Sequence, residues 1–304
     1  MKKLLVVLLF IFISAAVFIG AVSANGKSDL KPVTGTTADV QRIVSLAPSV
    51  TELLFALGLG DRVVGVTRQC LYPPEARAIA KIGGYYDPNY EQILRLKPDL
   101  VIMLTEHVPE KAMVTNLGIR VLVVDHMTVA GIVRSFTEIG TLCGVKEKAA
   151  AIVTDLEARM DRVKKKTSGL SRPRVMVSIG RGMGSGALKD IFIAGKGTFY
   201  DDLIVLSGGE NAYSGTAVKF PQVEIEGIYK LDPEIVIDMV PDCAGMKVTK
   251  KELLAEWGKA THVSAVKNKR VYIFEQDYAT VPGPRFILTL EQMVRVIHPE
   301  IAWE

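Results

Sequence analysis

The sequence is poor in cysteine, in histidine and in excess charge of either sign. Three cysteines and four histidines occur among 304 residues, and neither set has the spacing of a zinc or dithiol redox site. At least one thiol is unpaired in a monomer, and we expect small buried or loop cysteines. The formal net charge is only +4, and no basic stripe with interleaved aromatic residues occurs. The composition therefore does not favour nucleic-acid binding.

Long hydrophobic runs are absent except at the N-terminus. A short positive start precedes the apolar stretch Leu4–Ile19, and small residues, Val22-Ser23-Ala24, follow it. This pattern predicts a cleaved signal peptide, residues 1–24, and then a polar tail, residues 25–39. The alternative is an uncleaved N-terminal anchor, because the run approaches the about 20 residues that span a bilayer. No cysteine lies near the cleavage point, so we expect export to the periplasm or another extracytoplasmic space without a lipid anchor.

After the tail, strand-like and helix-like segments alternate in two series, as in a parallel α/β sheet. The segment Ser49-Val50-Thr51-Glu52 predicts a capping box at the start of a helix that ends near Gly58. The expected strands are 42–46, 63–66, 100–104 and 121–124 in the first series, and 174–179, 235–239 and 271–274 in the second.

An internal repeat relates the two series. Residues 90–102 align with residues 225–237 at a constant offset of 135, and Glu, Ile, Leu, Pro, an acid and Val-Ile recur in register. Residues 120–125 resemble residues 270–275 at a second offset of 150. Any two α/β units look somewhat alike, but the matched residue types favour two related lobes.

The two series are separated by one long helical pattern, in which apolar residues recur every three or four positions. We therefore expect an α/β fold with two mostly parallel lobes, residues 40–145 and 170–304. One helix, residues 146–169, joins them and favours a fixed cleft between them over a wide hinge.

Ligands of open α/β sheets bind beyond the carboxyl ends of the strands, so the loops that follow strands hold the candidate residues. Aromatic rings there suit a flat macrocycle or an aromatic chelator, and arginines suit an anionic chelate. Two tyrosines in one loop could also ligate haem iron. The alternative for the last arginine is a tie between the final helix and its neighbour. The candidates are Arg68, Tyr85, Tyr86, Arg181, Phe220, Asp242, Tyr278 and Arg285.

Motifs for catalysis or for a bare metal ion are weak. Residues 182–187 fit the dinucleotide fingerprint, but the sequence after them looks extended and no acidic partner follows. A nucleotide-using enzyme is therefore disfavoured. His107 and His126 follow neighbouring strands, yet two histidines make a thin metal site. We expect no catalytic residues and no cofactor besides a bound ligand.

Several segments resemble the periplasmic binding proteins that carry iron–siderophores and cobalamin for ABC importers. Together they span about residues 42–298. They are Arg42–Ser49 with Thr51-Glu52-Leu53, Gly83–Asn89 running into Leu96–Val101, Gly208–Asn211, and Phe220–Val223 ahead of Glu226.

The resemblance implies an extracytoplasmic, monomeric solute-binding protein that holds a metal chelate between its lobes and delivers it to an ABC permease. A ferric siderophore or related iron complex is the expected ligand, with a cobalamin-like corrinoid and then haem as alternatives. The resemblance also implies one acid on each lobe that pairs with permease arginines. Glu91 and Glu226 match these positions, and Glu224 is close enough to compete with Glu226. Tyr85 and Phe220 match aromatic positions of cobalamin-binding relatives.

Overall fold

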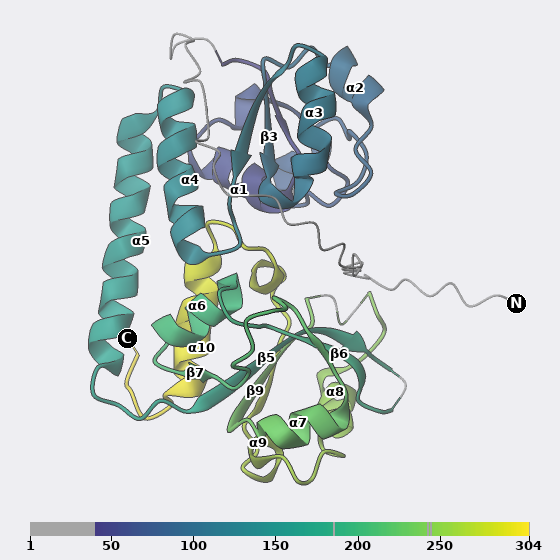
Figure 1. Cartoon of the computed structure of the whole chain (residues 1–304). Coiled ribbons are helices and arrows are strands. Elements are labelled where there is room, and N and C mark those ends of the chain that lie inside the picture. Colours follow the sequence, from purple (N-terminus) through teal and green to yellow (C-terminus); the bar gives the residue numbers. More distant parts are fainter. Residues whose placement is uncertain (1–39, 185, 242, 244, 304) are drawn as a thin grey trace, which may run out of the picture. The chain divides into compact units, whose positions relative to one another are not determined.

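The computed structural model describes residues 40–184, 186–241, 243 and 245–303 (Figure 1). Strands and helices alternate along this part of the chain. The strands are β1 (Ile43–Ser45), β2 (Val63–Val66), β3 (Leu100–Leu104), β4 (Arg120–Val124), β5 (Arg174–Gly182), β6 (Lys189–Ile193), β7 (Glu210–Asn211), β8 (Gln222–Val223), β9 (Ile235–Met239) and β10 (Val271–Phe274). The α-helices are α1 (Pro48–Ala56), α2 (Tyr90–Arg95), α3 (Val108–Asn116), α4 (Val129–Leu142), α5 (Lys146–Thr167), α6 (Phe199–Leu206), α7 (Ile225–Leu231), α8 (Lys250–Trp257), α9 (Ser264–Lys267) and α10 (Phe286–Ile297). Four 3₁₀ turns complete the described elements: η1 (Gly60–Arg62), η2 (Pro74–Ala78), η3 (Thr105–His107) and η4 (Asp277–Thr280).

The first lobe is built on a parallel sheet with the strand order β2-β1-β3-β4. Alternate residues of β3 enter different cores. Leu100 and Ile102 pack with α1, α4 and α5, whereas Val101 and Met103 pack with α2 and α3. Both faces are covered, which is why the strand is apolar along its whole length.

The second lobe is built on a mixed sheet with the order β10-β9-β5-β6-β8, and β7 pairs with β5. Strands β10, β9, β5 and β7 are parallel, whereas β6 pairs antiparallel with both β5 and β8. Helices α7, α8 and α9 cover one face, and α6 and α10 cover the other (Figure 1). The sequence predicts the parallel strands and an extended stretch at β6, but it misses the two-residue strands β7 and β8.

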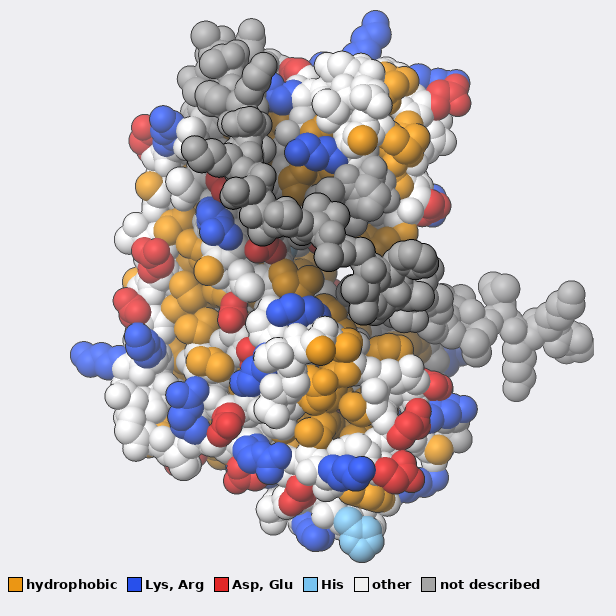
Figure 2. Space-filling model, viewed as in Figure 1, with side chains coloured by type: hydrophobic (Ala, Val, Ile, Leu, Met, Phe, Trp, Pro, Cys, Tyr) orange, Lys and Arg blue, Asp and Glu red, His pale blue; other side chains and the backbone are white. Residues whose placement is uncertain are grey.

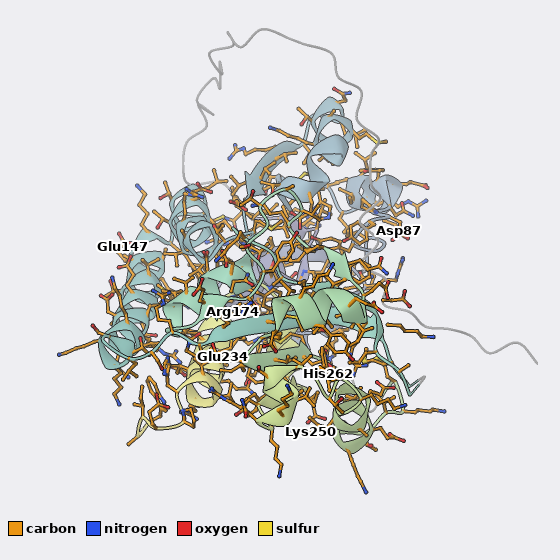
Figure 3. The ribbon with its side chains drawn as sticks, turned by 60° about the horizontal axis from the view of Figure 1, so that its bottom comes forward. Asp87, Glu147, Arg174, Glu234, Lys250 and His262 are labelled. Atoms are coloured by element: carbon orange, nitrogen blue, oxygen red, sulfur yellow. The ribbon has the colours of Figure 1, made fainter. Side chains whose placement is uncertain are left out.

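The sequence repeat has a structural counterpart at the start of each lobe. The backbone N–H of Arg42 donates to Asp99 Oδ1 at 3.0 Å. In the second lobe the backbone N–H of Arg174 donates to Glu234 Oε2 at 2.8 Å, and the two side chains lie together in Figure 3. Each arginine also donates from its guanidinium to a backbone carbonyl at the end of the helix before the acid. Asp99 and Glu234 are separated by the predicted offset of 135, so the repeat is confirmed.

Backbone conformation repeats as well. Lys97 and Asp232, again 135 positions apart, are both left-handed, with φ of 45° and 37°. Each precedes a proline and then a central strand, β3 or β9. The turn from helix to strand is therefore built in the same way in both lobes.

Helix α5 connects the lobes and shares its core with both. Ala149, Leu156 and Val163 are its buried residues, and they belong to one apolar cluster that also contains side chains of both sheets. Helix α5 runs alongside α4 (Figure 1). Arg159 of α5 contacts Glu291 of α10 at 2.8 Å, so the final helix returns to the connecting helix. Across the described ranges, no helix combines the length and the apolar character needed to cross a bilayer.

The predicted capping box is wrong. Helix α1 begins at Pro48, and its N-cap, Ala47, makes no side-chain capping bond. A proline suits the first turn because its missing N–H would be unpaired there. Ser49 and Glu52 consequently lie inside the helix, where both are buried. The helix ends as expected, with Gly58 left-handed just beyond it.

Candidate ligand-binding site

Tyr85 is the centre of an aromatic cluster in the first lobe. Its hydroxyl donates to Glu106 Oε1 at 2.5 Å. Its ring meets the edge of Tyr86 at a centroid distance of 4.7 Å and the ring of His107 at 4.5 Å. Tyr85 is partly buried against the main apolar cluster, whereas Tyr86 is largely exposed. The pair therefore offers one anchored ring and one free ring to a ligand.

His107 fixes the backbone of this loop. The N–H of Leu104 can only donate, so His107 Nδ1 accepts from it at 3.3 Å. The other ring nitrogen, Nε2, then donates to the Tyr85 carbonyl at 2.9 Å. His107 is buried and held from both sides. The sequence identifies this histidine as a possible metal ligand and misses its positioning role.

Arg68 lies beside the same loop. Its Nη2 contacts Asp87 Oδ2 at 2.8 Å, and both side chains are largely exposed, at 56% and 70%. The loop turns sharply at Gly83, which has φ of 99°, and an added Cβ would lie 2.4 Å from the Asp87 carbonyl oxygen. Only glycine fits there. The structure thus places Arg68, Tyr85 and Tyr86 in one segment of the first lobe, between β2 and α2.

The two tyrosines remain neutral phenols at physiological pH. Burial, and then the neighbouring Glu106 carboxylate, raise the pKa of Tyr85 far above its ordinary value. The same two causes raise the pKa of Tyr86. A tyrosinate is therefore disfavoured at this site, and the rings can act through stacking and through O–H donation.

Arg285 joins the lobes instead of projecting freely. It donates from Nε to Glu52 Oε2 at 2.9 Å and from Nη2 to Glu52 Oε1 at 2.6 Å, across 233 positions of sequence. It also contacts Asp277 at 2.9 Å, and its guanidinium lies 3.7 Å from the ring centre of Tyr72. The structural alternative foreseen for Arg285 is thus present, with a partner in the first lobe. Glu52 and Tyr72 are not among the sequence candidates.

This inter-lobe pair is largely dry. The side chains of Arg285 and Glu52 are 14% and 3% exposed. Burial raises the pKa of Glu52 despite the hydrogen bonds from Arg285. For Arg285, burial opposes the charge, but the hydrogen bonds to Glu52 and Asp277 outweigh it and raise the pKa.

A pocket of about 610 Å³ lies at this junction. It is lined on the first lobe by Glu52 and Tyr72 and on the second by Pro284 and Arg285, among others. Arg285 is the single predicted ligand residue among those lining it. Tyr278 lies near by, with its ring centre 5.6 Å from the Arg285 guanidinium.

The remaining predicted ligand residues lie in different settings. Phe220 and Tyr278 are both partly buried against the apolar cluster shared by the two lobes. Asp242 lies outside the described residues. Tyr85 is packed against the same large cluster.

The expectation for Arg181 does not fit its surroundings. Its side chain is fully buried in the second lobe, where it contacts Asp238 at 2.9 Å and Glu256 at 2.5 Å. Trp257 donates its indole N–H to the same Asp238 oxygen at 2.8 Å. The two carboxylates compensate the charge of the guanidinium, and the side chain is held in the lobe interior.

Metal-binding residues do not gather within the described ranges: no group of three or more His, Cys, Asp or Glu side chains is placed to hold an ion. His126 contacts Ser49 Oγ at 2.8 Å, and burial lowers its pKa to about 3. His107 has other partners, so the two histidines form no site. The three cysteines are buried, and none of them forms a disulfide.

Glu91 and Glu226 occupy the second position of the short helices α2 and α7. Both are exposed. Glu91 contacts Arg95 one turn later at 2.6 Å, in a pair whose side chains are both mostly in water. The predicted docking acids are thus at equivalent, accessible positions of the repeat.

With this geometry in hand, comparison with known proteins decides the family. The profile of the family described as periplasmic binding protein matches residues 43–278. The chain belongs to this family. An uncharacterized ABC transporter substrate-binding lipoprotein of Bacillus subtilis is 30% identical over 294 residues, which cover 91% of this chain and 89% of that protein. A vitamin B12-binding protein of Pectobacterium carotovorum is 28% identical over 256 residues, 83% and 87% of the two chains.

Solved structures agree on the architecture of this periplasmic binding protein. The periplasmic vitamin B12 binding protein of Vibrio cholerae superposes with a TM-score of 0.72 at 25% identity, covering 86% of this chain and 97% of that chain. A periplasmic heme-binding protein of Roseiflexus also gives 0.72, at 23% identity, covering 86% and 99%. At that identity the second likeness shows the fold alone.

Proposed function

We propose that this protein binds a flat metal macrocycle of the cobalamin type outside the cytoplasm and delivers it to an ABC permease. Relatives named vitamin B12-binding proteins, at 26–28% identity over most of the chain, support the ligand class. The observation that supports the proposal most is the Tyr85–Tyr86 pair, because an aromatic ring that packs on a flat ligand buries much of its area at little entropic cost.

Charge separates this ligand from the anionic alternatives. Arg181 and Arg285 each contact two carboxylates, so their charges are already compensated. Arg68 is the predicted arginine held only by an exposed pair. A highly anionic ferric siderophore needs several available cations, and of the three predicted arginines only Arg68 lacks a buried ion pair. A corrinoid, whose periphery is mainly amides, fits this setting better.

Haem is the second candidate, because two tyrosines stand side by side in the first lobe. Iron ligation by tyrosine requires a phenolate. Burial and Glu106 raise the pKa of Tyr85 and of Tyr86, which opposes that form. A corrinoid demands no such ionisation.

The test is titration of the purified protein with cyanocobalamin, haemin and a ferric catecholate, followed by calorimetry and absorption. We expect cyanocobalamin to bind at least tenfold more tightly than the others. Tyr85→Ala should weaken that binding about tenfold, the equivalent of roughly 1.4 kcal/mol, whereas Tyr85→Phe keeps the ring and most of the affinity. Preference for haemin or the siderophore would overturn the corrinoid assignment. Absence of binding to all three would overturn chelate carriage itself.

Delivery is proposed to use Glu91 and Glu226 as contacts for permease cations, with the mature chain acting as a monomer after removal of residues 1–24. Matched acids on two lobes fix orientation and speed encounter through electrostatic attraction. Charge reversal of both acids should abolish uptake while leaving ligand affinity unchanged. Normal uptake by that double variant would contradict the docking role.

A further inference from the structure

An exposed apolar side chain accompanies each proposed docking acid. Leu94 lies three residues after Glu91 on α2, and Tyr229 lies three residues after Glu226 on α7. They are 42% and 37% exposed, and neither belongs to an apolar core cluster. Residues three apart share one side of a helix. Each helix therefore presents an acid and an apolar group side by side.

The repeat makes this coincidence informative. Leu94 and Tyr229 are separated by the same offset of 135 that relates Glu91 to Glu226 and Lys97 to Asp232. Scattered exposed apolar residues are ordinary on a protein surface. Retention of one at the same position of both lobes, beside the same acid, is a property of the repeated unit. Figure 2 shows that charges of both signs are interspersed over the face in view. On this face, the sign of the surface charge alone therefore does not identify a docking area.

Energetics also call for an apolar contribution. Exposed ion pairs contribute only about 0–1 kcal/mol each, and Glu91 must first leave its pair with Arg95. Interfaces gain most of their free energy from a few well-packed residues, among which tyrosine is enriched, and burial of an exposed leucine side chain adds a hydrophobic gain of about 1.5–3 kcal/mol. Tyr229 suits that role because its ring already meets the edge of His262, at 5.7 Å between centroids, which restricts it before binding.

We propose that Leu94 and Tyr229 are the apolar anchors of the permease interface, each packing beside the ion pair made by the neighbouring acid. The inference rests on the proposed function. The partner must offer two like surfaces, each a basic residue next to a shallow apolar patch. We therefore infer a pair of similar permease subunits as the partner.

The experiment uses right-side-out membrane vesicles of the source bacterium and the full mature protein, with a photo-reactive benzoylphenylalanine in place of Gln92. Cross-linked products are identified by mass spectrometry, and the yield is followed against protein concentration. Leu94→Ala with Tyr229→Ala should raise the concentration for half-maximal cross-linking to an ABC permease subunit at least tenfold. The matched control, Met113→Ala with Val205→Ala, removes similarly exposed apolar groups, at 53% and 47%, and should change it less than twofold.

The outcomes separate the two levels of the proposal. If no ABC permease subunit is captured by the otherwise unaltered protein, docking itself fails. If a permease subunit is captured and Glu91→Gln with Glu226→Gln weakens capture, but the two alanine changes at 94 and 229 do not, the anchors are refuted and the docking role stands. Circular dichroism and cyanocobalamin titration of the anchor variant should match those of the unaltered protein, which excludes misfolding as the cause of any loss.

Discussion

Replacement of Arg285 by methionine should reveal how strongly the buried ion pair ties the lobes together. The change removes both hydrogen bonds to Glu52, whose side chain is 3% exposed, together with the guanidinium that lies over Tyr72. Removing one partner of a buried pair costs about 3–5 kcal/mol. Glu52 can instead take up a proton. Protonating a carboxyl with the ordinary pKa of 4.5 at pH 7 costs about 3.4 kcal/mol, because each pH unit above the pKa costs about 1.36 kcal/mol. We therefore expect a loss of about 3 kcal/mol at pH 7.

Acidification should shrink this loss. A carboxyl whose pKa is higher in the folded state than in the unfolded state binds its proton more tightly when the protein is folded. The stability that comes from this proton is complete below the unfolded pKa and is lost as pH rises through the folded pKa. In Arg285→Met the pKa of Glu52 rises further, because its partner is gone. The difference in unfolding free energy from the unaltered protein should fall by up to about 1.4 kcal/mol per unit as pH drops toward 4.5.

Urea unfolding between pH 5 and pH 8 measures the effect. Glu52→Gln added to Arg285→Met should recover about 2 kcal/mol at pH 7, because an amide carries no charge that must be buried. Arg68→Met is the matched control, since its pair with Asp87 is exposed and should contribute about 0–1 kcal/mol. A loss in Arg285→Met no larger than in Arg68→Met, or one that does not change with pH, would refute the reasoning.

Three further outcomes follow from the same structure. Gly283→Ala places a Cβ 3.2 Å from Ser49 Cα across the lobe junction, and should lower the unfolding free energy by about 1–3 kcal/mol in urea. Arg181→Met leaves the buried Asp238 without its ion-pair partner. This change should lower the unfolding free energy by about 3–5 kcal/mol, which a large fall in melting temperature would report. Burial lowers the pKa of His126 to about 3, so the folded state holds this histidine neutral. As pH falls from 6.5 toward 3, protonation of His126 in the unfolded state should lower the unfolding free energy by up to about 1.4 kcal/mol per pH unit. His126→Asn should flatten that slope, and an unchanged slope would exclude this histidine as its source.

The framework of the fold could be predicted because its signals are local. The strands of both series are short apolar runs between helical stretches, and a proline with a following acid marks the entry to β3 and β9 alike. The connecting helix is recognised from its own periodicity. Its observed extent is Lys146–Thr167.

The site was harder to predict because its contacts are distant in sequence. Nothing near Arg181 indicates that acids 57 and 75 positions away will enclose it. Glu52 likewise matches a helix-capping pattern locally, and its real partner lies 233 positions later. Loop position therefore predicts that Tyr85 and Tyr86 lie together, but it does not predict the ion-pair partners of Arg181 and Arg285, which come from distant parts of the chain.

The return of α10 to the connecting helix has a consequence for biogenesis. Arg285 and Glu291, which tie the second lobe to Glu52 and Arg159, lie near the C-terminus. During synthesis, all residues of the first lobe are made before Arg285, so Glu52 has no counterion until the end of the chain is made. A chain truncated before residue 285 would keep both sheets and lack the fastening between them. The two ion pairs can therefore form only after the last helix has been synthesised.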